Sequence, residues 1–236
     1  MDASGYVTLT RQSGLMSQME MIAHNMANLS TTGFRREGMV FSEYVQGVED
    51  GPSISMAYGN TRVVDLGQAG LTETGGTFDF ALQGEGFFQV QTPQGVMLTR
   101  AGAFMPAATG ELVTPEGFAL LDDGGSPVVV PAGLGPVSLA EDGTLSADGK
   151  PVARLGVVAP VDPNSLAHQM GTLFTAGPTQ PVDHPVVRQG YLEDSNVDPI
   201  SEIARMINVQ RAYEMGQSFL DREDDRVKSV IQTLGR

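Results

Sequence analysis

The two ends of this 236-residue chain carry helical periodicity and the middle does not, and this contrast limits the fold more than any other feature. Near the N-terminus, apolar residues recur every three or four positions, among them Leu15, Met19, Ile22 and Met26. This spacing places side chains on one face of an α-helix. We expect a helix from about residue 3 to near Ser30, and a positive φ angle at Gly33 just beyond it.

The C-terminal segment predicts a longer helix that begins at Asp198 and Pro199. Aspartate is a favourable N-cap and proline a favourable first helical residue. A helix from Asp198 to Leu234 would be about 55 Å long at about 1.5 Å per residue. Steps of three and four along it form the heptad seam of a coiled coil, through Met206, Val209, Tyr213, Gly216, Leu220, Glu223, Val227, Val230 and Leu234.

Further apolar residues widen the hydrophobic stripe of both helices. They lie beside the seam at Ile200, Ile203, Ile207 and Phe219, and at Leu15 beside Met16 in the N-terminal segment. Two helices that pair once cannot cover two apolar faces, so a second face needs a second partner. We therefore expect this chain to assemble with other molecules.

Residues 76–190 predict an all-β domain. Turn signals rich in glycine, proline and aspartate recur there, many about 8–12 residues apart. Phe78, Phe80 and Leu82 alternate with other residues, which predicts a strand with one buried face. We expect Phe87 and Phe88 in the β core, and one later strand over 152–158.

Residues 34–75 show no sustained period, and we expect an extended arm with a strand or two that lies against something. The predicted fold class is therefore α+β. Its parts are terminal helices over 1–33 and 191–236, the arm over 34–75 and the all-β domain over 76–190.

Composition excludes several classes of function. A formal net charge of −14 would repel a nucleic-acid backbone, so we expect no nucleic-acid partner. The chain has no cysteine, which excludes disulfides and thiolate chemistry. No stretch has the eighteen or so apolar residues of a membrane span, and we expect no cleaved secretory signal, because the first residues lack a basic and an apolar region.

The sequence offers no convincing catalytic, metal or cofactor site, and we expect none. Gly84-Glu85-Gly86 begins like a dinucleotide-binding loop, but the third glycine is missing and a strand-like run follows. The three histidines are isolated in the sequence and lack the spacing of metal ligands. Asp122-Asp123-Gly124 and Asp142-Gly143-Thr144 lack the oxygen ligands of a calcium loop and are typical of turns.

Three stretches resemble the axial proteins of the bacterial flagellum, the family of rod and hook subunits. The first is residues 25–36, Asn-Met-Ala-Asn-Leu-Ser-Thr-Thr-Gly-Phe-Arg-Arg, in which Met26 replaces the usual leucine. The second is Gly84–Val90 with Thr99–Phe104, and the third is Gly190–Asp198 with Gln210–Glu214. They occur in the family's order, so the resemblance spans essentially the whole chain.

The resemblance implies a self-assembling subunit of the basal-body rod in the periplasm. In this family the terminal helices form a coiled-coil inner domain around an export channel, with the β domain outside. It implies helical stacking with copies of itself and related rod subunits, export through the flagellar type III apparatus, and no insertion in the membrane. The modest length and the variable region 105–185 favour the proximal over the distal rod type, although Ala212-Tyr213-Glu214 keeps the distal type open. A secreted adhesin or fibre subunit is the rival class.

The resemblance also assigns an assembly interface. Its N-terminal junction comprises Asn25, Asn28, Thr31, Gly33 and Phe34, and its C-terminal junction Ser195, Asn196 and Val197. Its apolar members are Leu15, Met19, Ile22, Met26, Met206, Val209, Leu220, Val227, Val230 and Leu234. Arg211, Tyr213 and Glu214 would lie in the helix packing. Simple capping by Asn28 and Gly33, and an ordinary exposed face for the last three, are the alternatives.

Overall fold

The computed structural model describes residues 3–46, 54–131, 133 and 135–234, and these form a mixed α+β fold. The chain divides into two compact units. The helical unit comprises Met1–Ala27, Glu37–Val63 and Asp198–Arg236, and the β unit comprises Asn28–Arg36 and Val64–Val197. None of the described helices is long and apolar enough to cross a membrane.

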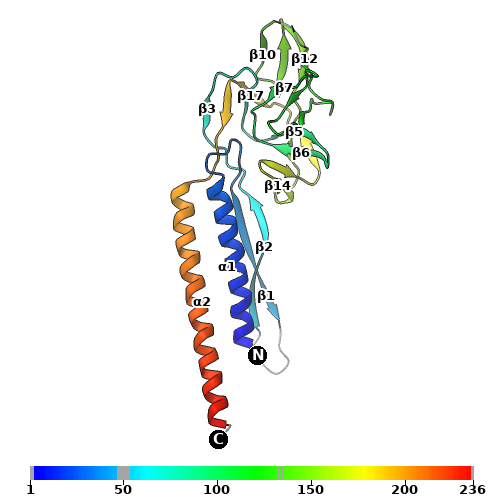
Figure 1. Ribbon diagram of the computed structural model, residues 1–236. Coiled ribbons are helices and arrows are strands. Elements are labelled where there is room, and N and C mark those ends of the chain that lie inside the picture. The colour runs from blue at the N-terminus through cyan, green and yellow to red at the C-terminus, as the bar shows by residue number, and fades with distance from the viewer. Residues whose placement is uncertain (1–2, 47–53, 132, 134, 235–236) are drawn as a thin grey trace. The chain divides into compact units, whose positions relative to one another are not determined.

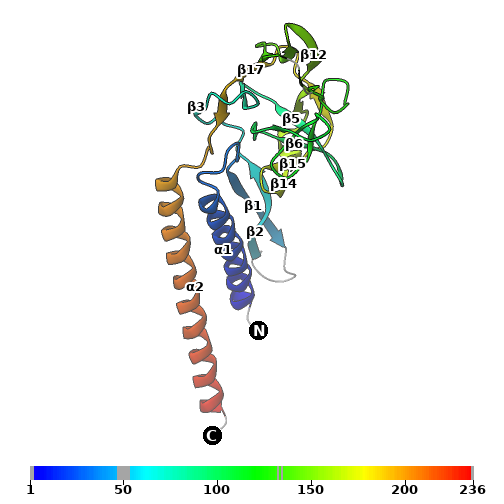
Figure 2. The ribbon, with the colours of Figure 1, turned by 45° about the horizontal axis from the view of Figure 1, so that its top comes forward.

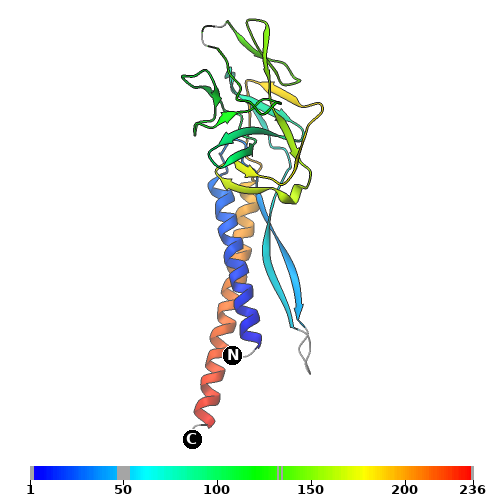
Figure 3. The same ribbon diagram turned by 90° about the vertical axis from the view of Figure 1, so that its right-hand side faces the viewer.

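The helical unit consists of two long helices and a β-hairpin. Helices α1 (Ala3–Ala27) and α2 (Pro199–Leu234) lie side by side, and strands β1 (Glu37–Gln46) and β2 (Ile54–Val64) form the hairpin along α1 (Figures 2 and 3). The helices bury Met21, Ile22 and Val209 between them, because the i, i+3 and i+4 spacing aligns these side chains on facing stripes. The segment expected to be an arm thus contains this hairpin, and its residues 47–53 lie outside the described residues.

Local hydrogen bonds explain where α1 ends and where α2 begins. Helix α1 ends at Ala27, three residues before the expected stop at Ser30. The reason is a turn in which the Asn28 carbonyl and side chain accept bonds from the Thr31 amide and hydroxyl, at 3.2 and 3.1 Å. Gly33 has the expected positive φ, at 68°. The predicted N-cap is confirmed, since the Asp198 carboxylate accepts bonds from two backbone amides of the first turn of α2.

The β unit is built around one nine-stranded sheet (Figure 1). Its main path runs in the order β14-β15-β6-β5-β9-β8-β7, and β13 pairs with both β5 and β16. Phe88, Val90 and Leu120 are among the side chains that it buries. The strands are β5 (Phe87–Thr92), β6 (Gly95–Thr99), β7 (Met105–Pro106), β8 (Leu112–Val113), β9 (Ala119–Leu120), β13 (Val157–Pro160), β14 (Ala167–Met170), β15 (Leu173–Thr175) and β16 (Thr179–Pro181).

Smaller strand groups complete the β unit. They are β10 (Val137–Leu139) with β11 (Thr144–Ala147) and β12 (Lys150–Arg154), β4 (Phe80–Gln83) with β17 (Val186–Gln189), and β3 (Leu71–Glu73) with β18 (Tyr191–Glu193). A short 3₁₀-helix, η1, covers Pro163–Ser165. The β3–β18 pair joins the beginning of the Val64–Val197 segment to its end in one ladder.

Two expectations about strands were wrong. The strand runs over Phe80–Gln83, and Ala81, on the face expected to be open, is as fully buried as Phe80, whereas Gln83 on the same face is exposed. Residues 152–158 form two strands and not one. The chain changes partners at Gly156, whose amide donates to the Leu121 carbonyl at 3.0 Å and which has no room for a Cβ beside the Asp122 carbonyl.

Other expectations about the β unit were confirmed. Phe87 and Phe88 are buried in its core. Gly84 and Gly86 have φ angles of 97° and 122° and form the turn between β4 and β5. Glycine suits both positions because other residues rarely adopt positive φ.

Candidate assembly site

In the helical unit, the site centres on the fully buried side chain of Asn25. Its Nδ2 donates to the Glu37 carbonyl oxygen at 2.9 Å, and its Oδ1 accepts from the Glu37 amide at 2.9 Å. The same Nδ2 lies 3.4 Å from Oε2 of Glu202. One amide therefore ties the last turn of α1 to the start of β1 and to the first turn of α2.

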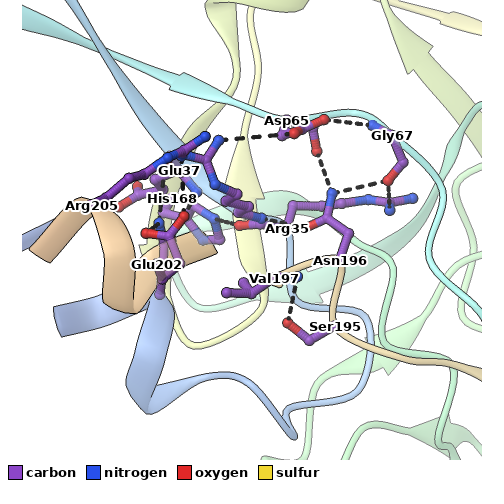
Figure 4. A network of polar contacts seen from close by, with 12 residues as sticks. Arg35, Glu37, Asp65, Gly67, His168, Ser195, Asn196, Val197, Glu202 and Arg205 are labelled. Atoms are coloured by element: carbon purple, nitrogen blue, oxygen red, sulfur yellow. Dashed lines mark hydrogen bonds and ion pairs between the residues drawn. The ribbon is translucent and has the colours of Figure 1, made fainter. Parts of the chain in front are cut away.

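Two buried carboxylates surround this asparagine. Glu37 lies 3.4 Å from His24 Nδ1 and 3.6 Å from Arg62 Nη1. Glu202 is fully buried and pairs with Arg205 at 3.1 Å, as Figure 4 shows. Because a buried carboxylate needs compensating donors or cations, these contacts fix the geometry at this end of the helix pair.

In the β unit, a buried ion cluster joins the segments that flank the two junctions. The Glu193 carboxylate receives Arg35 Nη2 at 2.9 Å on Oε1 and Arg100 Nε at 3.1 Å on Oε2. All three side chains are no more than 2% exposed. Burial lowers the pKa of Arg100 to about 10, against the opposing pull of Glu193, and the Arg35 charge adds to the lowering. Burial likewise lowers the pKa of Arg35, although Glu193 opposes it. Arg100 therefore stays charged at neutral pH.

Asn196 connects the two junctions within the β unit. Its Oδ1 accepts from the Arg36 amide at 2.6 Å, and its Nδ2 donates to the Asp65 and Gly67 carbonyls at 3.0 and 2.9 Å. Its own amide donates to the Phe34 carbonyl at 3.3 Å. Figure 4 shows this side chain between Asp65 and Gly67. The structure thus brings the N-terminal and C-terminal junctions together through hydrogen bonds of Asn196 to main-chain groups.

Gly33 and Phe34 pack tightly at this junction. The Gly33 amide donates to the Glu193 carbonyl at 2.7 Å. A Cβ on Gly33 would lie 2.3 Å from the Ala101 amide nitrogen, so no larger residue fits. The buried Phe34 ring stacks on His168, with centroids 5.1 Å apart, and His168 Nε2 lies 2.9 Å from the Arg35 carbonyl.

The remaining predicted residues fall into two groups. Leu15, Met19, Met26 and Met206 pack around the buried Ile22 and Val209. Val197 is buried, and its amide donates to the Ser195 hydroxyl at 3.4 Å.

The residues of the second group lie outside the cluster formed by the first. Arg211 and Glu214 are exposed, and Tyr213 and Leu220 are half-buried. Val227 and Val230 are exposed, and the side chain of Leu234 lies outside those described.

The sequence reasoning missed the buried charges. It assigned no role to Arg35, Glu37, Arg100, Glu193 or Glu202, which are all buried. The available signal was weak: Arg35 follows Phe34 and a glycine, Arg100 ends a strand-like run, and neither belongs to a helix with a solvated face. Nothing in the spacing pairs them with Glu193.

The described residues offer little to a metal. Among residues 3–46, 54–131, 133 and 135–234, no three His, Asp or Glu side chains form a group that could hold one. The two Asp-Gly segments form turns, as expected: Asp122 accepts from the Gly124 amide at 2.9 Å, and Asp142 from the Thr144 amide at 3.0 Å. The Thr144 hydrogen bonds lower the pKa of Asp142.

Comparison with known proteins connects this site to a family. Residues 188–233 match the model for the flagellar basal body rod FlgEFG protein C-terminal region, and residues 81–147 match the flagellar hook protein FlgE/F/G D1 domain. The basal-body rod protein FlgF of Caulobacter vibrioides is 38% identical, over 100% of this chain and 99% of the relative. The FlgF of Mesorhizobium japonicum is 35% identical, over the same shares.

A FlgG rod protein, from Agrobacterium fabrum, is 31% identical, over 97% of this chain and 98% of the relative. These FlgF proteins are more similar to the chain than this FlgG is, so the preference for the proximal type, FlgF, over the distal type, FlgG, is confirmed. The chain belongs to the FlgE/F/G family of flagellar basal-body rod and hook proteins.

Proposed function

We propose that this FlgF-type rod subunit builds the torque-transmitting shaft by stacking helically with copies of itself and with related axial proteins. The relatives named FlgF and FlgG are basal-body rod proteins, which supports a structural role and not an enzymatic one. Export through the flagellar type III apparatus without a cleaved signal, and a place in the periplasm, belong to the same proposal.

The observation that carries this proposal is the uncovered apolar surface of α2. Helix α2 has 36 residues and α1 has 25, which correspond to about 54 Å and about 37 Å. Figure 1 shows α2 continuing past the N-terminal end of α1. In that last part, Val227, Val230 and Ile231 are 47%, 49% and 64% exposed. Contiguous apolar surface of this kind marks a site of association.

A second apolar surface lies on the half of α2 that has α1 beside it. Ile200, Ile203 and Ile207 are 78%, 47% and 44% exposed, on positions three and four residues apart. One face of α2 thus packs on α1 while a second remains open. A second helix partner from a neighbouring subunit would cover it.

We assign the terminal segments 1–33 and 191–236 to a discontinuous coiled-coil inner domain that surrounds the export channel. The heptad seam of α2 supports this assignment, since a sustained 3.5-residue repeat is the pattern of supercoiled helices. The methionines Met19, Met26 and Met206 around the helix core support it too, because methionine adapts to more than one packing partner. The β domain over 76–190 would lie outside this inner domain.

Charge introduced into the open surface tests the proposal. The triple variant Val227→Asp, Val230→Asp, Ile231→Asp should leave the chain stable and exported but abolish swimming. A matched control, Ser229→Asp, Gln232→Asp, Thr233→Asp, adds the same charge at exposed polar positions of the same turns and should still swim. Normal swimming of the apolar triple variant would refute the proposed role of α2.

A further inference from the structure

A small pocket in the β unit is lined in part by the two buried arginines of the Glu193 ion cluster. Its volume is about 100 Å³, and its lining includes Arg35, Arg100, Leu66, Phe87 and Ala159. Its lining is therefore mainly apolar, apart from Arg35, Arg100 and Glu85. Glu85 is exposed, which places its carboxylate at the solvent side.

The two guanidinium groups have donors to spare. Arg35 uses Nη1 on the Gly67 carbonyl and Nη2 on Glu193, and Arg100 uses Nη2 on the Gly84 carbonyl at 2.6 Å. Arg35 Nε and Arg100 Nη1 are buried and make no hydrogen bond to any described residue. Buried polar atoms without a partner are uncommon and indicate a missing ligand or water.

The charge of the cluster is also unbalanced. Within the described part of the β unit, the buried charged side chains are Arg35, Arg100 and Glu193, which leaves one excess positive charge. The Asp65 carboxylate is half exposed and lies 4.0 Å from Arg36, with which it also interacts. It therefore offsets the excess positive charge of the buried cluster only partly. A buried excess charge is unfavourable unless an anion compensates it. The lowered pKa of Arg100 agrees with this imbalance.

We propose that the Arg35–Arg100 pocket binds a carboxylate, which an acidic side chain of a neighbouring copy of this chain supplies in the assembled rod. Guanidinium groups favour carboxylates because the fork of donors matches two oxygens. The chain itself is a plentiful source, with 28 acidic against 14 basic residues. The source of the carboxylate rests on the proposed rod function, whereas the pocket's affinity for a carboxylate does not.

Titration of the dilute, full-length chain with sodium acetate tests the pocket directly. The arginine Nε–H NMR signals of Arg35 and Arg100 should shift and saturate with acetate, and not with sodium chloride at equal ionic strength. Ala159→Met fills the pocket while both arginines are retained and should abolish the saturable shift. Glu85→Gln removes a repelling charge at the opening and should tighten acetate binding several-fold.

Each other result of this titration overturns the proposal. Absence of a saturable shift in the folded wild-type chain shows that the pocket binds no carboxylate. An equal shift in Ala159→Met shows that acetate binds elsewhere. Saturation with inorganic phosphate but not with acetate would show that the pocket binds another oxoanion and not a carboxylate. Circular dichroism of each variant confirms that it is folded.

Polymer formation tests the neighbour as the source. At high protein concentration, acetate should reduce the pelleted fraction of the wild-type chain relative to chloride, and Ala159→Met should pellet less and be insensitive to acetate. Normal pelleting of Ala159→Met overturns the neighbour as the source while the acetate titration stands. If no variant or condition gives polymer, the proposed rod function fails, and the titration still decides on the pocket.

Discussion

The side chain of Asn25 forms a donor and an acceptor hydrogen bond with the main chain of Glu37, both 2.9 Å long. A neighbouring strand would offer the same pair of bonds, so the asparagine completes the pairing of β1 at a position where helix α1 lies beside it. Asparagine is suited to this because it carries one acceptor and two donor hydrogens. An ionised aspartate has no donor hydrogen and alanine has neither group, so neither residue can form this pair of bonds.

Asn25→Ala should destabilise the helical unit. It leaves the buried amide and carbonyl of Glu37 without partners, which we expect to lower the free energy of unfolding by about 2–4 kcal/mol. Hydrogen exchange of the Glu37 amide should become faster. The exposed Glu20→Ala on the same helix serves as the control and should leave that exchange rate unchanged. Unaltered protection of Glu37 in Asn25→Ala would show that the side chain does not hold β1.

Two glycines with nearly the same φ give a matched test of packing. Gly33→Ala should lower the free energy of unfolding of the β unit by more than about 3 kcal/mol, because the new Cβ meets backbone atoms of Arg100 and Ala101. Gly75 has a φ of 69° but has no atoms within 4 Å of a Cβ, so Gly75→Ala should cost about 1 kcal/mol. Denaturant unfolding measures both. Equal losses would mean that φ alone, and not the close approach, requires glycine at residue 33.

Glu193→Gln should be strongly destabilising. It removes the negative charge between Arg35 and Arg100 and leaves two buried cations together, which we expect to cost about 3–5 kcal/mol. The control is Glu73→Gln, at an exposed position of β3, where little change is expected. The denaturant midpoints of the two variants, compared with that of the wild-type chain, measure both effects. A Glu193→Gln chain as stable as wild type would show that the ion cluster contributes nothing to the fold.

The N-cap of α2 should depend on pH. Hydrogen bonds from the Ser201 hydroxyl and from backbone amides lower the pKa of Asp198 below its ordinary value of 3.8. A lowered carboxyl pKa stabilises the folded state above the ordinary value, and this contribution is lost as the pH falls through the folded pKa. Amide protection of Ile200 and Ser201 should therefore weaken in acid.

Asp198→Asn separates capping from titration. Its amide oxygen can still cap the helix, but it does not ionise, so protection in the first turn of α2 should lose its acid dependence. Hydrogen exchange of Ile200 and Ser201 across the acid range measures this. The same acid dependence in Asp198→Asn would assign the effect to another group.

The sequence was a good guide where structure is local. The start of α2 depends on Asp198 and Pro199, which are neighbours in the chain, and the helices depend on apolar spacing within a few turns. The end of α1 was missed by three residues because Asn28 competes for the Thr31 amide, a choice that propensities alone do not settle.

The sequence was a poor guide where structure depends on distant segments. Ala81 is buried on a face that alternation assigned to solvent, and residues 152–158 change sheets at Gly156 because of contacts with residues 121 and 122. The ion cluster was missed for the same reason. Arg35 and Glu193 lie far apart in the sequence and meet only in the folded β unit, and one sequence carries no sign of their pairing.

The most direct test of assembly through α2 is the accessibility of residue 230 before and after the rod forms. The chain has no cysteine, so a thiol-reactive label reports only on the thiol introduced by Val230→Cys. In the isolated chain, where Val230 is 49% exposed, labelling should be fast. In basal bodies purified from swimming cells that carry this variant, labelling should be strongly slowed, because a neighbouring subunit covers the helix. Equally fast labelling in both states would contradict assembly through this face of α2.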